Sequence, residues 1–299
     1  MSSVLALDIG GTKLAAALVS ATGEVSAHRE VPTPPSSMGA DHLAATLTRL
    51  AVETAACGSP VGAAIAAAGP LDLAAGTISP VNIAAWRDFD VVSRIAKATG
   101  LPTVLIGDAL AAAVAEHWLG AATGSRALLG IVVSTGIGGG LVLNGGPFPG
   151  PSGNAGHLGH VVVDPAGPPC SCGARGCVEA IASGPATLRW AHAQGWPGPG
   201  MPALAEAAKS GEEIALAAFD RAADALAAGL VATSALCDLD TVVVGGGVAA
   251  AGEVLLGPLR ERYAEHATLP YTRRTRIVQA RLGRHSGLIG AARHALTSL

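Results

Sequence analysis

The chain has 299 residues, of which 50% are hydrophobic, so it is long enough to bury one large core or two ordinary ones. Its 19 basic and 22 acidic residues give a net charge of −3 without a basic block, which argues against a nucleic-acid-binding protein. No apolar run has membrane-spanning length, and the first residues do not resemble a secretory signal peptide. We therefore expect a globular, cytoplasmic protein whose partner is a small molecule rather than nucleic acid or a membrane.

The first part of the chain is organised around a glycine turn between two apolar runs. The motif Asp8-Ile-Gly-Gly-Thr-Lys13 joins these runs, which predicts an antiparallel strand hairpin. Further along, a buried strand leads directly to Asp108, which opens an alanine-rich helix. The elements expected here are strands at 4–6, 14–19, 61–67 and 103–106 and helices at about 41–56 and 108–119.

The second part of the chain restarts the same pattern. An apolar run at 127–133 ends in Ser134-Thr-Gly-Ile-Gly-Gly-Gly140, and a second apolar run follows at 141–143. A third glycine cluster, 245–247, ends a strand expected at 241–244. Helices are expected at about 212–237, 249–266 and 287–297. Two parts that each begin with a glycine-containing hairpin indicate an internally duplicated α/β fold with a ligand cleft between the halves.

The three glycine turns are candidate phosphate-binding segments. Glycines let backbone N–H groups approach phosphate oxygens, a threonine can donate a hydrogen bond, and an aspartate can hold Mg²⁺ directly or through water. One such turn alone is more often a hairpin without a ligand, but three in one chain favour a nucleotide site. The candidate residues are Asp8, Gly10, Gly11, Thr12, Lys13, Thr135, Gly136, Gly138, Gly139, Gly245 and Gly246.

Two common nucleotide-binding motifs are absent. A dinucleotide fingerprint beginning at Gly136 would require glycine at position 141, where Leu141 stands, and the sequence contains no P-loop motif. A nucleotide held between two hairpins remains, and this pattern resembles the superfamily of sugar kinases, Hsp70 and actin. Asp108, expected beside the cleft, is a candidate general base that takes the proton of an attacking hydroxyl, although an aspartate also begins many helices without any catalytic role.

A cluster of cysteine and histidine predicts a metal site. His160, Cys170, Cys172 and Cys177 offer three thiolates and one imidazole, a donor set that suits a closed, structural Zn²⁺ site. A disulfide or free thiols are the alternatives, and a cytosolic location disfavours the disulfide. The neighbouring His157 could be a further ligand, a solvent-exposed side chain or a donor to the substrate, and its spacing does not decide between these.

Taken together, these motifs resemble the ROK family of bacterial sugar kinases along nearly the whole chain. The first two glycine turns match the phosphate turns of that family, and residues 156–179 contain its Gly-x-x-Gly-His and Cys-x-Cys-Gly-x-x-Gly-Cys-x-Glu elements. The resemblance implies an actin-like, ribonuclease H-like ATPase fold with two lobes around a central cleft, and a homodimer. Residues 1–108 would form the N-terminal lobe, completed by helix 287–299, and residues 109–286 the C-terminal lobe.

Within the family, the sequence is most similar to members that act on N-acetylmannosamine. The segments that carry this likeness include 156–160, 164–168 and 177–184, and His157 stands where many relatives have glutamate. The resemblance implies phosphorylation of the 6-hydroxyl of this sugar by ATP with Mg²⁺, a step in sialic acid catabolism. Glucose, N-acetylglucosamine or another hexose is the alternative substrate, and a non-catalytic sugar sensor is a second alternative.

The resemblance also assigns roles to individual residues. Asp108 would be the general base, and zinc on the Cys/His cluster would hold one wall of the sugar pocket. The residues expected to line this pocket, besides Asp108, are Asn82, His157, His160 and Glu179. Two positions depart from the family pattern: Gly107 replaces an asparagine that usually contacts the sugar, and Leu110 stands where relatives often have asparagine. These departures leave the preferred sugar open.

Overall fold

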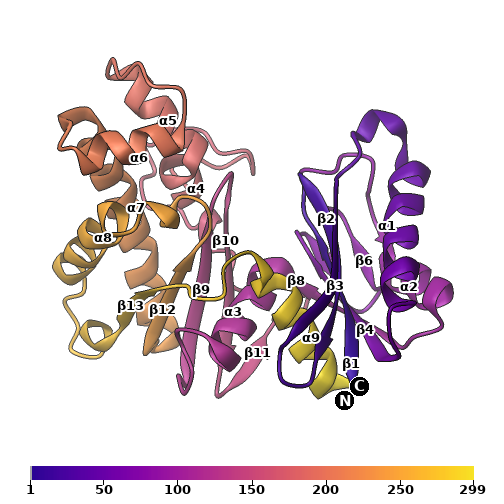
Figure 1. Ribbon diagram of the computed structural model, residues 1–299. Helices are drawn as coiled ribbons and strands as arrows, with labels where there is room; N and C mark the ends of the chain where they lie inside the picture. Colours follow the sequence, from indigo (N-terminus) through magenta and orange to yellow (C-terminus); the bar gives the residue numbers. More distant parts are fainter. Residues whose placement is uncertain (1) are drawn as a thin grey trace.

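A computed structural model describes residues 2–299 as two α/β halves with the same sheet topology (Figure 1). One sheet has the strand order β3-β2-β1-β4-β8 and the other the order β11-β10-β9-β12-β13. In each sheet three strands form an antiparallel meander, and two further strands are added in parallel. This arrangement confirms the duplicated α/β fold that the repeated glycine hairpins predicted.

The N-terminal sheet is covered on its outer face by α1 and α2. Leucine, isoleucine and tryptophan side chains of these helices, the sheet and the loops between them form one buried cluster. The side chain of Asp90 caps α2 by accepting a hydrogen bond from the backbone N–H of Ser93 (3.1 Å). The elements of this half are β1 (Ser3–Ile9), β2 (Lys13–Ser20), β3 (Val25–Pro32), α1 (Ala40–Ala55), β4 (Pro60–Ala67), β5 (Leu71–Asp72), β6 (Thr77–Ile78), β7 (Phe89–Asp90), α2 (Val91–Thr99) and β8 (Thr103–Gly107).

The C-terminal sheet is covered by a group of helices packed around the long helix α7. The expected helix at 249–266 begins later than the sequence indicated, because Gly252 has a φ of +70° and separates a short 3-10 turn from α8. The elements of this half are α3 (Asp108–Leu119), β9 (Ala127–Val133), β10 (Ile137–Leu143), β11 (Gly146–Phe148), α4 (Val178–Ala182), α5 (Gly184–Ala193), α6 (Met201–Lys209), α7 (Glu213–Cys237), β12 (Thr241–Gly245), α8 (Glu253–His266) and β13 (Arg276–Gln279).

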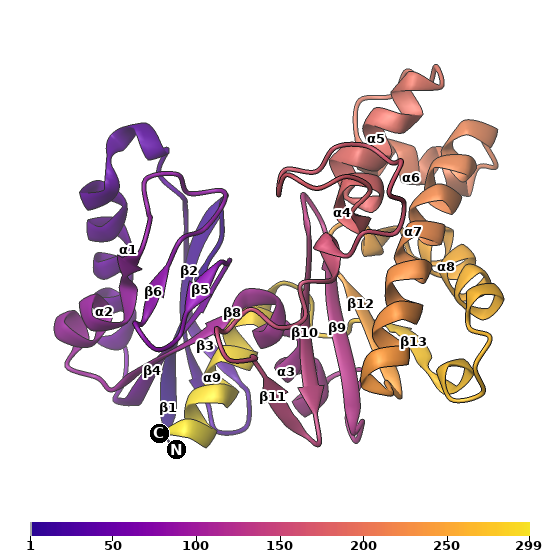
Figure 2. The ribbon, with the colours of Figure 1, turned by 180° about the vertical axis from the view of Figure 1, so that it is seen from behind.

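Two equivalent helices, α3 and α9 (Ser286–Ser298), lie between the sheets and pack against each other (Figures 1 and 2). Helix α9 lies on β1 and β4, whereas α3 lies on β9 and β10. Their backbones approach closely, because a Cβ atom at Gly290 would lie 1.7 Å from the carbonyl oxygen of Ala111. A third apolar cluster fills this inner layer. The helix pair therefore forms the floor on which the two halves meet.

Within residues 2–299, no helix combines the length and the apolar character that crossing a membrane requires.

Candidate active site and zinc loop

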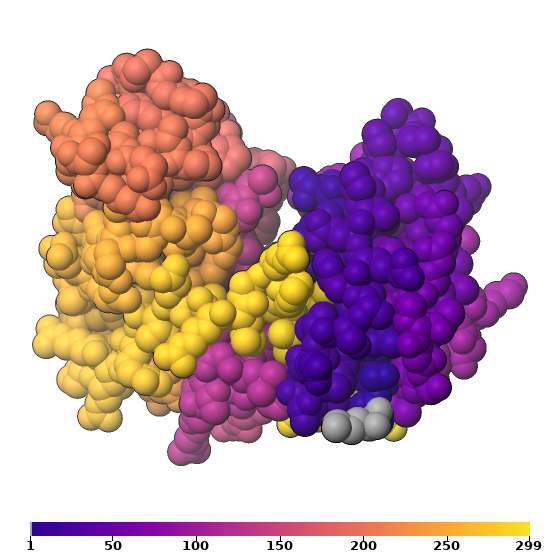
Figure 3. Space-filling model, viewed as in Figure 1, coloured from indigo at the N-terminus to yellow at the C-terminus, as the bar shows by residue number. Residues whose placement is uncertain are grey.

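A cavity of about 550 Å³ lies between the two halves, above the α3–α9 pair (Figure 3). Its wall includes the first glycine turn, the first residue of α3, the end of β9 and the beginning of α9. The candidate phosphate-binding residues that line it are Asp8, Gly10, Thr12, Lys13, Gly245 and Gly246. The first and third glycine turns, far apart in sequence, therefore face one common space, together with Asp108.

The first turn is tightly closed and contacts a candidate sugar residue. The backbone N–H of Gly10 donates to the carbonyl oxygen of Lys13 (3.0 Å), and the hydroxyl of Thr33 donates to the carbonyl oxygen of Gly10 (2.7 Å). A Cβ atom at Gly11 would lie 2.6 Å from Cβ of Asn82. Glycine at position 11 thus allows Asn82 to lie directly against the first glycine turn.

Two carboxylates, Asp8 at the end of β1 and Asp108 at the start of α3, lie at the floor of the cavity. Burial, with the negative charge of Asp108, raises the pKa of Asp8 from 3.8 to about 7. Burial also raises the pKa of Asp108, and the hydrogen bond that its carboxylate accepts from the backbone N–H of Ala109 partly opposes that rise. A carboxylate with a raised pKa is a stronger base than one in water, which is what proton removal from a hydroxyl requires.

The beginning of α9 adds a partial positive charge to this floor. A Cβ atom at Gly287 would lie 3.0 Å from Oδ2 of Asp8, so the first turn of α9 contacts this carboxylate directly. The unpaired backbone N–H groups of a helix N-terminus favour anions. The geometry therefore suits either a carboxylate or a phosphate group at this end of the cavity.

The second glycine turn contributes less to the cavity than the sequence suggested. Ser134 lines it, but Thr135, Gly136, Gly138 and Gly139 do not. A Cβ atom at Gly139 would lie 2.3 Å from the carbonyl oxygen of Gly156, and one at Gly136 would lie 2.7 Å from Oε2 of Glu179. Glycine at position 139 is explained by close packing against the segment that follows β11, and glycine at position 136 by close packing against a side chain of α4.

The remaining candidate sugar residues lie on that segment and on α4. Oε2 of Glu179 accepts a hydrogen bond from the backbone N–H of Ile137 (2.8 Å), so Glu179 also holds the second glycine turn. His157 is exposed, and its ring stacks on that of His160 with centroids 6.3 Å apart. A Cβ atom at Gly69 would lie 3.4 Å from Nε2 of His157, so this ring lies against the N-terminal half.

The structure brings the four predicted zinc ligands together. One potential ligand atom from each of His160, Cys170, Cys172 and Cys177 lies within 4.8 Å of the other three. The Cys172 and Cys177 sulfur atoms are 3.7 Å apart, as are Cys170 Sγ and His160 Nδ1. In a tetrahedral site with Zn–S bonds of about 2.3 Å, neighbouring sulfur atoms are about 3.8 Å apart. The donor set and its spacing therefore fit Zn²⁺.

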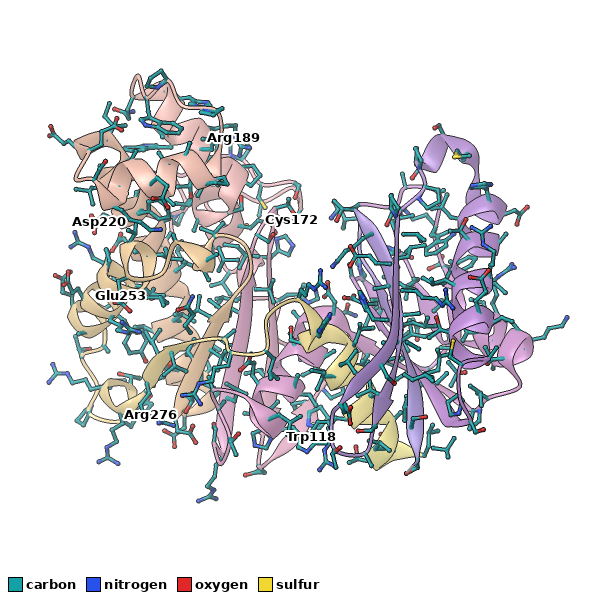
Figure 4. The ribbon with its side chains drawn as sticks, viewed as in Figure 1. Trp118, Cys172, Arg189, Asp220, Glu253 and Arg276 are labelled. Carbon is teal, nitrogen blue, oxygen red and sulfur yellow. The ribbon has the colours of Figure 1, made fainter. Side chains whose placement is uncertain are left out.

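The loop around these ligands has little core of its own. Isolated β-bridges join Val162 to Cys177 and Pro169 to Arg175. At Gly176, φ is +67° and a Cβ atom would lie 1.5 Å from the carbonyl oxygen of Asp164, so the turn requires glycine. Figure 4 shows Cys172 on the side of the C-terminal half that faces the cleft.

Several residues of the site have no clear signal in the sequence. Glu116 is buried in α3 and lines the cavity. Its carboxylate accepts hydrogen bonds from the backbone N–H groups of Ala121, Arg281 and Leu282 (each 2.8 Å), which ties α3 to the segment that leads into α9. Arg284 and Ser286 also line the cavity. Only the position of these two residues at the start of an expected helix could have suggested such a role.

Comparison with known proteins extends these observations. The model of the ROK family matches residues 4–298. An N-acetylmannosamine kinase of Escherichia fergusonii is 40% identical over 297 residues, which cover 97% of each chain. A ROK hexokinase of Thermus thermophilus is 37% identical, with a TM-score of 0.83 over 97% of this chain and 96% of that one. A ROK family glucokinase of Streptomyces griseus, solved in complex with glucose and AMPPNP, is 31% identical, with a TM-score of 0.86 over 99% of this chain and 100% of that one.

Proposed function

This chain belongs to the ROK family, and from this premise we propose that it transfers a phosphoryl group from ATP to the 6-hydroxyl of N-acetylmannosamine. The observation that carries the proposal is the placement of Asp108 and the first glycine turn in one cavity, in a chain that is 40% identical to an N-acetylmannosamine kinase. The solved complex of the Streptomyces griseus glucokinase with AMPPNP supports a triphosphate donor.

The phosphoryl transfer is assigned to residues at the floor of the cavity. Asp108 accepts the proton of the sugar hydroxyl as that oxygen attacks phosphorus. The backbone N–H groups of the first and third glycine turns and of the α9 N-terminus stabilise the phosphate charge, with Lys13 beside them. Asp8 would hold Mg²⁺, which supplies charge neutralisation on the phosphates when bound. The raised pKa of Asp8 fits this role, because a cation beside it would restore the ionised form.

The sugar site is assigned to the edge of the cavity near the zinc loop. Asn82, His157, His160 and Glu179 would bind sugar hydroxyls, and Zn²⁺ on the four ligands would hold the loop that carries His157 and Glu179. His160 would bind the metal through Nδ1, the atom near Cys170, which leaves Nε2 free to face the sugar. The zinc is thus proposed as a structural brace and not as a participant in the chemistry.

A hexose kinase acting on glucose or mannose is the second candidate. The 37% identity to a ROK hexokinase favours it, as does Gly107. A Cβ atom at Gly107 would make only an ordinary contact, 3.6 Å from Leu71 Cδ1, so the backbone leaves room for a side chain to begin there. Leu110, the other departure from the family pattern, is buried in the apolar cluster between the two sheets, so its side chain serves packing.

A coupled assay with ATP, Mg²⁺ and a panel of sugars tests the proposal. We expect the highest kcat/KM for N-acetylmannosamine, and a lower KM for this sugar in the Gly107→Asn variant. Equal or better turnover of glucose would assign the chain to the hexokinases instead, and ATP-independent sugar binding without turnover would make it a sensor.

Four further expectations from the sequence remain proposals. They are a homodimer, a cytoplasmic location, a role in sialic acid catabolism, and lobes formed by residues 1–108 with 287–299 and by residues 109–286. Sedimentation velocity of the purified chain tests the first, with about twice the monomer mass expected.

A further inference from the structure

A side chain of the C-terminal half pairs with the backbone of the N-terminal half beside the proposed sugar site. The chain after β11 reaches across toward the N-terminal half before it returns to the zinc loop (Figure 2). There the backbone N–H of Leu71 in β5 donates to Oδ1 of Asn154 (3.0 Å), and Nδ2 of Asn154 donates to the carbonyl oxygen of Leu71 (2.9 Å). The carboxamide of Asn154 thus pairs with both the N–H and the carbonyl group of Leu71, as the backbone of a neighbouring strand would.

The backbone around this contact is closely fitted. A Cβ atom at Gly69 would lie 3.3 Å from Oδ1 of Asn154 and 3.4 Å from Nε2 of His157. Gly153 has a φ of +93°, and a Cβ atom there would lie 2.6 Å from Cγ of Leu73. Glycine on both sides of the contact therefore lets Asn154 and His157 approach the N-terminal half together.

The same residue determines which nitrogen of His157 carries the proton. Nδ1 of His157 lies 2.8 Å from the carbonyl oxygen of Asn154. A carbonyl oxygen only accepts hydrogen bonds, so Nδ1 must be the donor. In the neutral ring Nε2 is then left with its lone pair as an acceptor. Because Nε2 lies toward Gly69, this acceptor is presented at the boundary between the halves, where a sugar hydroxyl or amide N–H could donate to it.

We propose that Asn154 is a positioning residue that fixes the place and the tautomer of His157, and so contributes to sugar discrimination. The inference rests on the proposed sugar kinase function. Its physical basis is the two-point pairing with Leu71, which anchors a loop of one half to the other half at the sugar site. A substrate recognised in this way must offer a hydrogen-bond donor to Nε2 of His157.

Steady-state kinetics of Asn154→Ala and Asn154→Asp test the proposal. Alanine removes both bonds to Leu71, whereas aspartate keeps the acceptor and places a carboxylate against the Leu71 carbonyl oxygen. We expect both variants to raise the KM for the sugar about tenfold, because small displacements of a binding group are costly. The KM for ATP should stay near the wild-type value, and the ratio of kcat/KM between N-acetylmannosamine and glucose should change. Ser152→Ala is the matched control, since Ser152 contacts Asn154 within the same loop but does not bond to Leu71.

An unchanged sugar KM in both variants, or equal increases in both KM values with loss of stability, would overturn the proposal. The tautomer provides a readout that does not depend on activity. Nitrogen NMR of histidine-labelled protein, with the His157 signals assigned from a His157→Gln sample, should show the Nδ1–H form in the wild type. The Nε2–H form in the wild type would also overturn it. A wild type with the Nδ1–H form but no activity on any sugar would instead count against the proposed function.

Discussion

The two glycine hairpins occupy equivalent places in the two sheets, yet they have different surroundings. In the first hairpin Asp8 lies one position before the last strand pair, Ile9 with Leu14. In the second, the same register position is held by Val132, next to the pair Val133 with Ile137. Both Asp8 and Val132 line the cavity, so one hairpin presents a carboxylate and the other a methyl surface. The two halves thus share their sheet topology, but only the first hairpin carries a carboxylate at this register position.

The glycines of the two hairpins also differ in what they make possible. Gly11 in the first turn is exposed and leaves room for Asn82, at the side of the site. In the second hairpin, a Cβ atom at Gly140 would lie 2.3 Å from Cα of Leu110 in α3, and one at Gly139 would clash with Gly156. Identical residues thus make room for a side chain in one copy and for backbone packing in the other.

The variant with the largest expected effect tests a difference between the two helices that follow the sheets, namely the residue with which each helix begins. Asp108 begins α3, whereas Ser286 begins the equivalent helix α9. If Asp108 is the base, Asp108→Asn should lower kcat by about 10³-fold, within the range usual for general base catalysis. The melting temperature should stay the same or rise, because the variant removes a buried charge near Asp8.

Ser286→Ala, at the equivalent helix start, is the comparison; its kcat should fall much less than that of Asp108→Asn, because the variant keeps the backbone N–H groups of this helix start. An Asp108→Asn enzyme that retains a tenth of the wild-type kcat would exclude the carboxylate as the base.

The second effect concerns the segments that follow the two hairpins. In the first half α1 follows β3 with its own apolar face, but in the second half a loop with few buried residues follows β11. We expect one zinc per chain by elemental analysis. Cys172→Ser should lose it, lower the unfolding free energy by more than about 2 kcal/mol and raise the sugar KM more than the ATP KM. The exposed Cys57 offers a control: Cys57→Ser should keep the metal. Full stability and activity of metal-free protein would contradict the structural role.

The sequence predicts the duplicated topology well but only part of the site. The strand hairpins could be predicted because apolar runs flank each glycine turn. The clustering of the four candidate zinc ligands could be predicted because their donor types and spacing are specific. The role of each glycine could not be predicted, because Gly139 and Gly11 differ only in which segment folds against them. Gly139 meets a residue 17 positions later in the sequence, and Gly11 meets a residue 71 positions later. Glu116 and Asn154 were missed for the same reason: their partners are backbone groups distant in sequence.

A third pair of variants separates Gly139, which packs against backbone, from Gly11, which packs against a side chain. Gly139→Ala places a methyl group against the carbonyl oxygen of Gly156, so we expect it to destabilise the protein by about 1–3 kcal/mol. Gly11→Ala instead pushes on the side chain of Asn82, and should raise the sugar KM with a small change in melting temperature. Thermal unfolding and steady-state kinetics of both variants check the distinction. If Gly11→Ala were the more destabilising variant, the first turn and not the second would be the more tightly packed one.

The smallest effect is a pH dependence that only the first hairpin can produce. Folding raises the pKa of Asp8 from 3.8 to about 7, so the folded protein holds this proton over a pH range in which the unfolded chain has released it. The contribution of Asp8 to stability is therefore fully present below about pH 4 and is lost as the pH rises through about 7. In metal-free, nucleotide-free protein, Asp8→Asn should raise the melting temperature at pH 8 more than at pH 5. Differential scanning fluorimetry at both values checks this, with Val132→Ala as the control at the equivalent position, because its destabilisation should be the same at both. A pH-independent effect of Asp8→Asn would mean that Asp8 is ionised throughout this range, and the two hairpins would then differ in charge without any energetic cost to the ligand-free fold.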